Sequence, residues 1–137
     1  MNRSLFLLVS GTYGILLFLA MVFATTPTLQ NYGVPNVDLN HLSLMQFLGI
    51  STGALALLLV LNRNAPNTYT LRTLLLAQAL YILAGVVLGV YHVYVLNVPT
   101  SAFFVGDSLF RLALGLGFLY FYNRESKLAG SESPVLV

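Results

Sequence analysis

Four apolar segments, each long enough to cross a lipid bilayer, constrain this chain of 137 residues more than any other feature. They lie at about 4–25, 42–62, 71–96 and 102–122. A helix needs about 20 apolar residues to cross the hydrocarbon core, and its backbone groups must be bonded within the segment. Strands of a β-barrel would alternate in polarity over about 10 residues, which these segments do not. The sequence therefore predicts an all-α membrane protein whose domain, 1–123, is a four-transmembrane-helix up-down-up-down bundle.

Composition supports this class and excludes several others. Hydrophobic residues make up 58% of the chain and charged residues 7%, whereas a soluble domain has about 25% charged residues. The net charge of +2 comes from few residues and forms no basic cluster, so we expect no nucleic-acid partner. The absence of cysteine excludes disulfides, thiolate metal sites and cysteine nucleophiles. The expected surroundings are a lipid bilayer, of the bacterial inner-membrane type.

The first apolar segment could also be read as a secretory signal peptide. Arg3 precedes it, and Val22-Phe23-Ala24 resembles a cleavage site. The apolar core of a signal peptide usually spans about 7–15 residues, and this segment is longer. We therefore expect a retained helix.

The positive charges predict the orientation of the four helices. Short connections make neighbouring helices antiparallel, which places five of the six cationic residues on one side of the bilayer. By the positive-inside rule, that side and both termini are cytoplasmic. Residues 26–41 then form an outer loop, and residues 124–137 form a flexible cytoplasmic tail. The five cationic residues are Arg3, Arg63, Arg72, Arg124 and Lys127.

Small residues mark the faces along which the helices should pack. Gly49 and Gly53 are four residues apart in the second segment, and Gly85 and Gly89 repeat this spacing in the third. Glycines at such spacing let helices approach closely. This pattern is typical of ordinary helix packing, with a self-dimerisation face as the alternative. In the first segment, Tyr13 falls on the face predicted to point inward.

An acid and a base interrupt the last apolar segment. Asp107 and Arg111 are four residues apart, so their side chains can meet on one face of a helix. Gln46 and His92 are expected in the same outer half of the bilayer, which makes these four residues a candidate ligand-binding pocket. Ionisable residues within a membrane often mark functional sites. The alternative is a structural ion pair that locks the last helix to its neighbours or to a partner subunit.

Transfer of protons or ions through the bundle is a further alternative for these residues. It would need polar groups that continue to the cytoplasmic side, where only Gln78 and Tyr81 are available.

The two histidines raise the question of a cofactor. His41 and His92 both fall on the outer side, so together they could ligate a haem, and His92 alone could ligate a pigment. An interfacial hydrogen-bonding role is the simpler interpretation, and we predict no cofactor and no metal site. Asp38 could join them as a zinc ligand, but the spacing is not diagnostic. Ser108 beside Asp107 lacks a nucleophile elbow, so no catalytic residues are predicted.

The second segment carries a resemblance to a known family. The stretch FLGISTGALALLLVLNRN is a glycine-bearing helix ended by an arginine, and an acidic residue stands early in the last helix. With the outer loop and the compact inner turn, this layout resembles the small DoxX-like membrane proteins and related four-helix families of unknown function. The resemblance implies the four-helix layout and carries over no functional residue.

Two functional hypotheses follow from the sequence. The first is a non-catalytic accessory or structural subunit of a larger membrane complex, bound to other membrane subunits or to copies of itself. The second is a protein that binds a small ligand or lipid, a carrier or an enzyme, with a polar pocket that opens to the outer leaflet.

Overall fold

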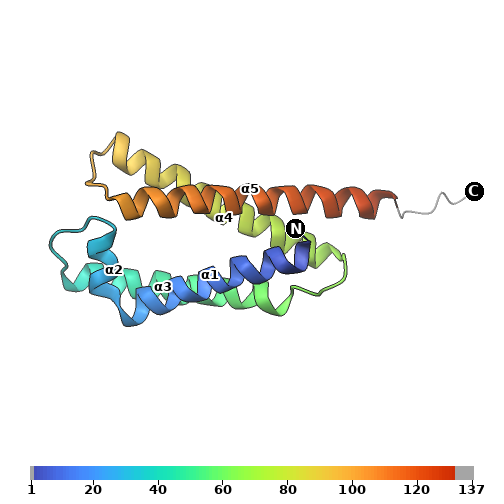
Figure 1. Cartoon of the computed structure of the whole chain (residues 1–137), viewed down its shortest axis with the longest axis horizontal. Helices are drawn as coiled ribbons and strands as arrows, with labels where there is room; N and C mark the ends of the chain where they lie inside the picture. Colours follow the sequence, from blue (N-terminus) through green and yellow to red (C-terminus); the bar gives the residue numbers. More distant parts are fainter. Residues whose placement is uncertain (1, 132–137) are drawn as a thin grey trace, which may run out of the picture.

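The computed structural model describes residues 2–131, which form five α-helices and no strand (Figure 1). The helices are α1 (Arg3–Phe23), α2 (Thr25–Asn31), α3 (Leu39–Leu61), α4 (Tyr69–Tyr94) and α5 (Ala102–Ser131). All except the short α2 are long and apolar enough to cross a membrane. The prediction of an all-helical chain with four apolar spans is therefore confirmed.

Polar caps define where the long helices begin. The side chains of Asn2 and Thr68 accept hydrogen bonds from the backbone N–H groups of Leu5 and Leu71, three residues along the chain. Asp38 accepts one from the His41 N–H, and the His41 ring faces back to the Asp38 backbone as a capping box. Each cap satisfies a donor that the first helical turn leaves unpaired.

Two helix boundaries differ from the sequence prediction. The outer loop expected at 26–41 contains α2, where Pro27 lies in the first turn and costs the helix no hydrogen bond. The last helix was expected to end at 122, before a flexible tail at 124–137. It continues to Ser131 instead, because Glu125 is buried and pairs with Arg3. Residues 132–137 of that tail lie outside the described residues.

The long helices associate as two pairs, α1 with α3 and α4 with α5, which lie one above the other in Figure 1. The pairs meet in an apolar core near the start of α1 and the end of α5. There the Phe6 ring lies 4.7 Å from that of Phe118 and 4.9 Å from that of Phe121. The core consists of Phe6, Leu7, Leu59, Leu71, Leu75, Ala79, Leu114, Phe118 and Phe121.

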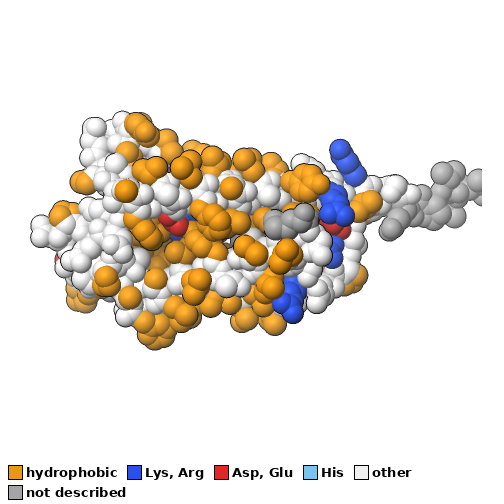
Figure 2. Space-filling view, in the orientation of Figure 1, with side chains coloured by type: hydrophobic (Ala, Val, Ile, Leu, Met, Phe, Trp, Pro, Cys, Tyr) orange, Lys and Arg blue, Asp and Glu red, His pale blue; other side chains and the backbone are white. Residues whose placement is uncertain are grey.

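Polar contacts show which chain segments share each end of the molecule. At the end that carries the N-terminus, Arg3 contacts Glu125 of α5 at 2.7 Å and donates to the Ala65 carbonyl in the α3–α4 connection. At the other end, the Ser101 hydroxyl donates to the Asn31 carbonyl. The α1–α3 connection therefore touches the α4–α5 connection there. On the face shown in Figure 2, Lys and Arg side chains gather at the end where α5 finishes, and hydrophobic side chains cover the middle.

Candidate functional site

An ion pair on α5 forms the centre of the candidate site. Nε of Arg111 donates a hydrogen bond to Oδ2 of Asp107 at 2.7 Å, across one helical turn. The Asp107 side chain is only 8% exposed and that of Arg111 is 28% exposed. A carboxylate so far removed from water needs partners for its charge.

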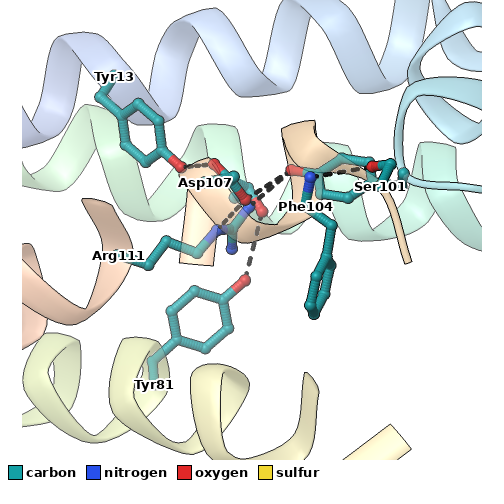
Figure 3. Close-up of polar contacts among 8 residues, drawn as sticks. Tyr13, Tyr81, Ser101, Phe104, Asp107 and Arg111 are labelled. Atoms are coloured by element: carbon teal, nitrogen blue, oxygen red, sulfur yellow. Dashed lines mark hydrogen bonds and ion pairs between the residues drawn. The ribbon is translucent and has the colours of Figure 1, made fainter. Parts of the chain in front are cut away.

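Two tyrosines complete the coordination of this carboxylate. The Tyr13 hydroxyl, on α1, donates to Oδ1 of Asp107 (Figure 3). The Tyr32 hydroxyl, just after α2, donates to Oδ2 at 2.7 Å and accepts from Nη2 of Arg111 at 3.3 Å. We call Tyr13, Tyr32, Asp107 and Arg111 the carboxylate cluster. It joins the α1–α3 side of the molecule to α5.

Aromatic packing holds the two tyrosines in place. The Tyr13 ring lies edge-on to Phe110 at 4.8 Å, and the Tyr32 ring lies edge-on to Phe103 at 5.1 Å. Burial raises the pKa of Tyr32 to about 12, with Asp107 also raising it and Arg111 opposing. Tyr32 therefore remains a protonated donor at physiological pH.

A cleft of about 380 Å³ opens beside the carboxylate cluster. Its walls come from all four long helices and from Tyr32. They are mainly apolar, and the polar groups among them are Tyr32, Tyr81, Asp107, Ser108 and Arg111. The apolar lining includes Met21, Met45, Leu48, Val86, Leu88 and Phe104. Such a combination of apolar walls and a few convergent polar groups is typical of a small-molecule site.

A second, smaller cavity of about 40 Å³ adjoins the cleft. Tyr81 and Arg111 line both spaces, and the smaller cavity adds Ser10, Thr52 and Gln78. The Tyr81 and Thr52 hydroxyls lie 3.3 Å apart. The apolar core closes this cavity on the side of the chain termini, since Leu59, Leu114 and Phe118 also belong to its wall.

The structure brings together two of the four residues predicted for the pocket. Asp107 and Arg111 meet, but Gln46 and His92 are not part of the cleft lining. The exposed Gln46 reaches the Val22 carbonyl and the Thr25 hydroxyl, at 3.4 and 3.5 Å. His92 is also exposed, with its ring 6.1 Å from that of Tyr91. The cleft therefore contains two of the four residues, and their role in binding a ligand stays a prediction.

Sequence reasoning missed both tyrosines of the carboxylate cluster as site residues. Tyr13 carried a usable signal, since it lies on the inward face of the first segment. No sequence pattern indicated a site role for Tyr32, because its position depends on how residues 24–38 fold over the end of the bundle.

The predicted packing glycines fall into different surroundings. A Cβ atom at Gly49 would lie 2.9 Å from Met21, and one at Gly53 would lie 2.7 Å from Phe18, so both glycines pack against α1. A Cβ at Gly89 would meet Phe104 of α5 at 3.1 Å. Gly85 has no atom within 4 Å of that position and borders the cleft.

The histidines occupy separate positions in the structure. His41 belongs to the cap of α3, with Nδ1 2.9 Å from Oδ1 of Asp38, and the exposed His92 lies near the end of α4. Within residues 2–131, no three His, Cys, Asp or Glu side chains group as metal ligands would. The absence of a cofactor stays a prediction, and a haem or pigment bound through His92 or His41 stays its untested alternative.

No protein-family model, curated protein or solved structure matches the chain. A function can therefore be argued only from the cleft, the carboxylate cluster and the arrangement of the helices.

Proposed function

We propose that this protein is an integral membrane protein that binds a small amphipathic ligand in the cleft beside the carboxylate cluster. One observation carries the proposal: a mainly apolar cleft of about 380 Å³ has a hydrogen-bonded charge pair in its wall. Apolar walls take up a hydrocarbon part, and convergent polar groups fix the orientation of a head group.

The proposal includes an up-down-up-down passage through a membrane of the bacterial inner-membrane type, with both termini cytoplasmic. Five cationic residues at the chain termini and the α3–α4 connection favour the cytoplasm for that end. The cleft then opens in the outer half of the bilayer.

Binding, rather than catalysis, suits the chemistry of the cluster. Asp107 already accepts hydrogen bonds from Tyr13, Tyr32 and Arg111. Both of its oxygens are therefore engaged by the protein's own donors. Its contribution is to hold the Arg111 guanidinium at the cleft wall.

Filling the cleft tests the proposal. Gly85 borders the cleft and has open space where a side chain would lie, so Gly85→Leu should occupy the cleft without a clash. Gly106 also has open space but is not part of the cleft lining, which makes Gly106→Leu the matched control. Native mass spectrometry of protein taken from membranes should show a bound ligand that Gly85→Leu loses and Gly106→Leu keeps. Equal ligand occupancy in the two variants would overturn the proposal.

The accessory-subunit hypothesis rests on a different surface. Gly106, with nothing within 4 Å of its Cβ position, offers a shallow place on α5 for a partner helix. Under this hypothesis, cross-linking in native membranes captures a partner that Gly106→Leu loses and Gly85→Leu keeps. A wild-type protein that purifies alone and cross-links to nothing rejects it.

A further inference from the structure

We infer that the ligand of the cleft is a neutral oxygenated lipid, such as a long-chain ketone or quinone, whose acceptor oxygen enters the small cavity behind Arg111. This inference rests on the proposed function and adds the chemical class of the ligand and the position of its head group.

The two spaces adjoin at a shared wall. Tyr81 and Arg111 line both the cleft and the cavity of about 40 Å³. A group that enters the cleft beside Arg111 therefore lies next to the smaller cavity. A water molecule needs about 10–15 Å³ of such volume, so the cavity admits a carbonyl oxygen but not a sugar or phosphodiester head group.

Ser10 provides an unused hydrogen-bonding group in this cavity. Its side chain is 3% exposed, and Oγ has no hydrogen-bond partner among the described residues. Several other helical hydroxyls bond back to a carbonyl four residues earlier, as Thr52 does to Leu48 and Thr73 to Tyr69. The buried Ser10 hydroxyl is thus left for an occupant of the cavity, since buried polar groups are rarely unpaired.

Hydrogen-bond donors remain available at the head-group position. Both Asp107 oxygens are already engaged by Tyr13, Tyr32 and Arg111. The groups that remain include the Ser10 hydroxyl, the Gln78 amide and the part of the Arg111 guanidinium not bonded to Asp107 or Tyr32. The Thr52 and Tyr81 hydroxyls of the same wall pair with each other. The Ser10 hydroxyl and the Gln78 amide can each donate, and the guanidinium can only donate, so a ligand oxygen that accepts is favoured beside Arg111.

The charges at the site favour an uncharged head group. Asp107 and Arg111 neutralise each other at 2.7 Å, so the site has no net charge to attract an ion. An anionic head near Arg111 would meet the Asp107 carboxylate, and a cationic head near Asp107 would meet the guanidinium. Such repulsion is strong where water is scarce.

Three matched probes test the inference: a long-chain methyl ketone, the alkane of the same length and the fatty-acid anion of the same length. The full-length protein is placed in phosphatidylcholine nanodiscs, and affinity is measured by competition, with a labelled ketone carbonyl observed by NMR. We expect the ketone to bind at least about tenfold more tightly than the other two, because one or two hydrogen bonds distinguish them.

Variants of Ser10 locate the oxygen. Ser10→Ala should weaken ketone binding about fivefold, the effect of one neutral hydrogen bond, and shift the carbonyl resonance. Ser10→Val fills the cavity and should weaken ketone binding further. Ser51→Ala is the control, because the exposed Ser51 hydroxyl bonds only to its own helix at Phe47. Alanine at Ser10 removes an unpaired hydroxyl, so the fold should tolerate it.

The outcomes separate the inference from the proposed function. Two results would overturn the inference alone, provided that Gly85→Leu still abolishes binding. The first is that the fatty-acid anion binds as tightly as the ketone or more tightly. The second is that neither Ser10 variant changes the affinity for the ketone. If Gly85→Leu changes the binding of none of the probes and of no native lipid, both the inference and the proposed function are overturned.

Discussion

At the residue scale, Asp107 connects more parts of the chain than any other side chain of the site. One carboxylate accepts from Tyr13 of α1, from Tyr32 after α2 and from Arg111 of its own helix. A buried charge is stable only when hydrogen bonds and a counter-charge replace water. These contacts therefore hold the α4–α5 pair to the α1–α3 pair at the end of the molecule that lacks the apolar core.

The effects of leucine substitutions at Asp107 and Arg111 on the free energy of unfolding should be strongly non-additive. Arg111→Leu leaves a carboxylate that is 8% exposed without a counter-charge, and we expect a loss of about 3 kcal/mol in the free energy of unfolding. Asp107→Leu should cost less, because Arg111 is more exposed and can turn toward water. The double variant should be more stable than Arg111→Leu. Unfolding in detergent measures all three, and additive losses would contradict this prediction.

The tyrosines should each contribute through one hydrogen bond to a charged acceptor. We expect Tyr13→Phe and Tyr32→Phe to lower the free energy of unfolding by about 1.5–3 kcal/mol each. The control is Tyr120→Phe, whose ring is 61% exposed and whose loss should change little. The same unfolding measurement applies, and tyrosine variants no less stable than the control would show that the cluster adds nothing to stability.

The ion pair could be predicted from sequence, whereas the rest of the site could not. A spacing of four residues on a helix brings Asp107 and Arg111 together whatever the tertiary fold. The tyrosine contacts depend on how separate helices rotate and cross, which no local pattern specifies. Gln46 illustrates this dependence: it was expected beside the ion pair, but its side chain turns toward Val22 and Thr25.

At the element scale, the start of α3 depends on the charge of Asp38. The hydrogen bond from the His41 N–H lowers the pKa of this carboxyl below its ordinary value of 3.8. The contribution of the cap is therefore present above 3.8 and is lost as the pH falls through the lower pKa of the folded state. The His41 amide resonance in NMR should shift over that range. Asp38→Asn, which caps without a charge, should remove the shift; a shift that persists would contradict the prediction.

Close packing between α1 and α3 depends on Gly11 as well as on the predicted Gly49 and Gly53, and sequence analysis did not single out Gly11. A Cβ at Gly11 would lie 2.5 Å from Val60 Cγ2 and 3.0 Å from the Ala56 carbonyl oxygen. We expect Gly11→Ala to cost about 1–3 kcal/mol of the free energy of unfolding through overpacking. Gly106→Ala, with open space around it, should be neutral or should gain up to about 1 kcal/mol in helix propensity. If Gly11→Ala and Gly106→Ala change the free energy of unfolding equally, α1 and α3 can move apart with little loss of stability.

The long helices were predictable and the ends of two elements were not. Long apolar runs predict the long helices, but the starts expected at about 4, 42 and 71 lie one to three residues after the observed starts at Arg3, Leu39 and Tyr69. The extension of α5 to Ser131 depends on the contact between Glu125 and Arg3, which are 122 residues apart in sequence. No local pattern contains such a contact.

At the scale of the whole molecule, the two helix pairs are joined differently at their two ends. Apolar side chains of Phe6, Phe118 and their neighbours join the pairs near the chain termini. Near the other end the carboxylate cluster joins them, and the cleft lies beside it. Polar groups hold helices together at specific points without filling the space between them. This arrangement explains why a cleft is found at the cluster and not at the core.

The orientation of the whole molecule can be tested cleanly because the chain contains no cysteine. Single cysteines at the exposed positions Asn36 and Thr100 should react with a membrane-impermeant thiol reagent added outside intact cells or spheroplasts. Cysteines at the exposed Pro66 and Ser131 should react only after the membrane is opened. This pattern follows if the five cationic residues keep their end cytoplasmic. Labelling of Ser131→Cys from outside would reverse the orientation, and unequal labelling of Asn36→Cys and Thr100→Cys would reject the up-down-up-down passage itself.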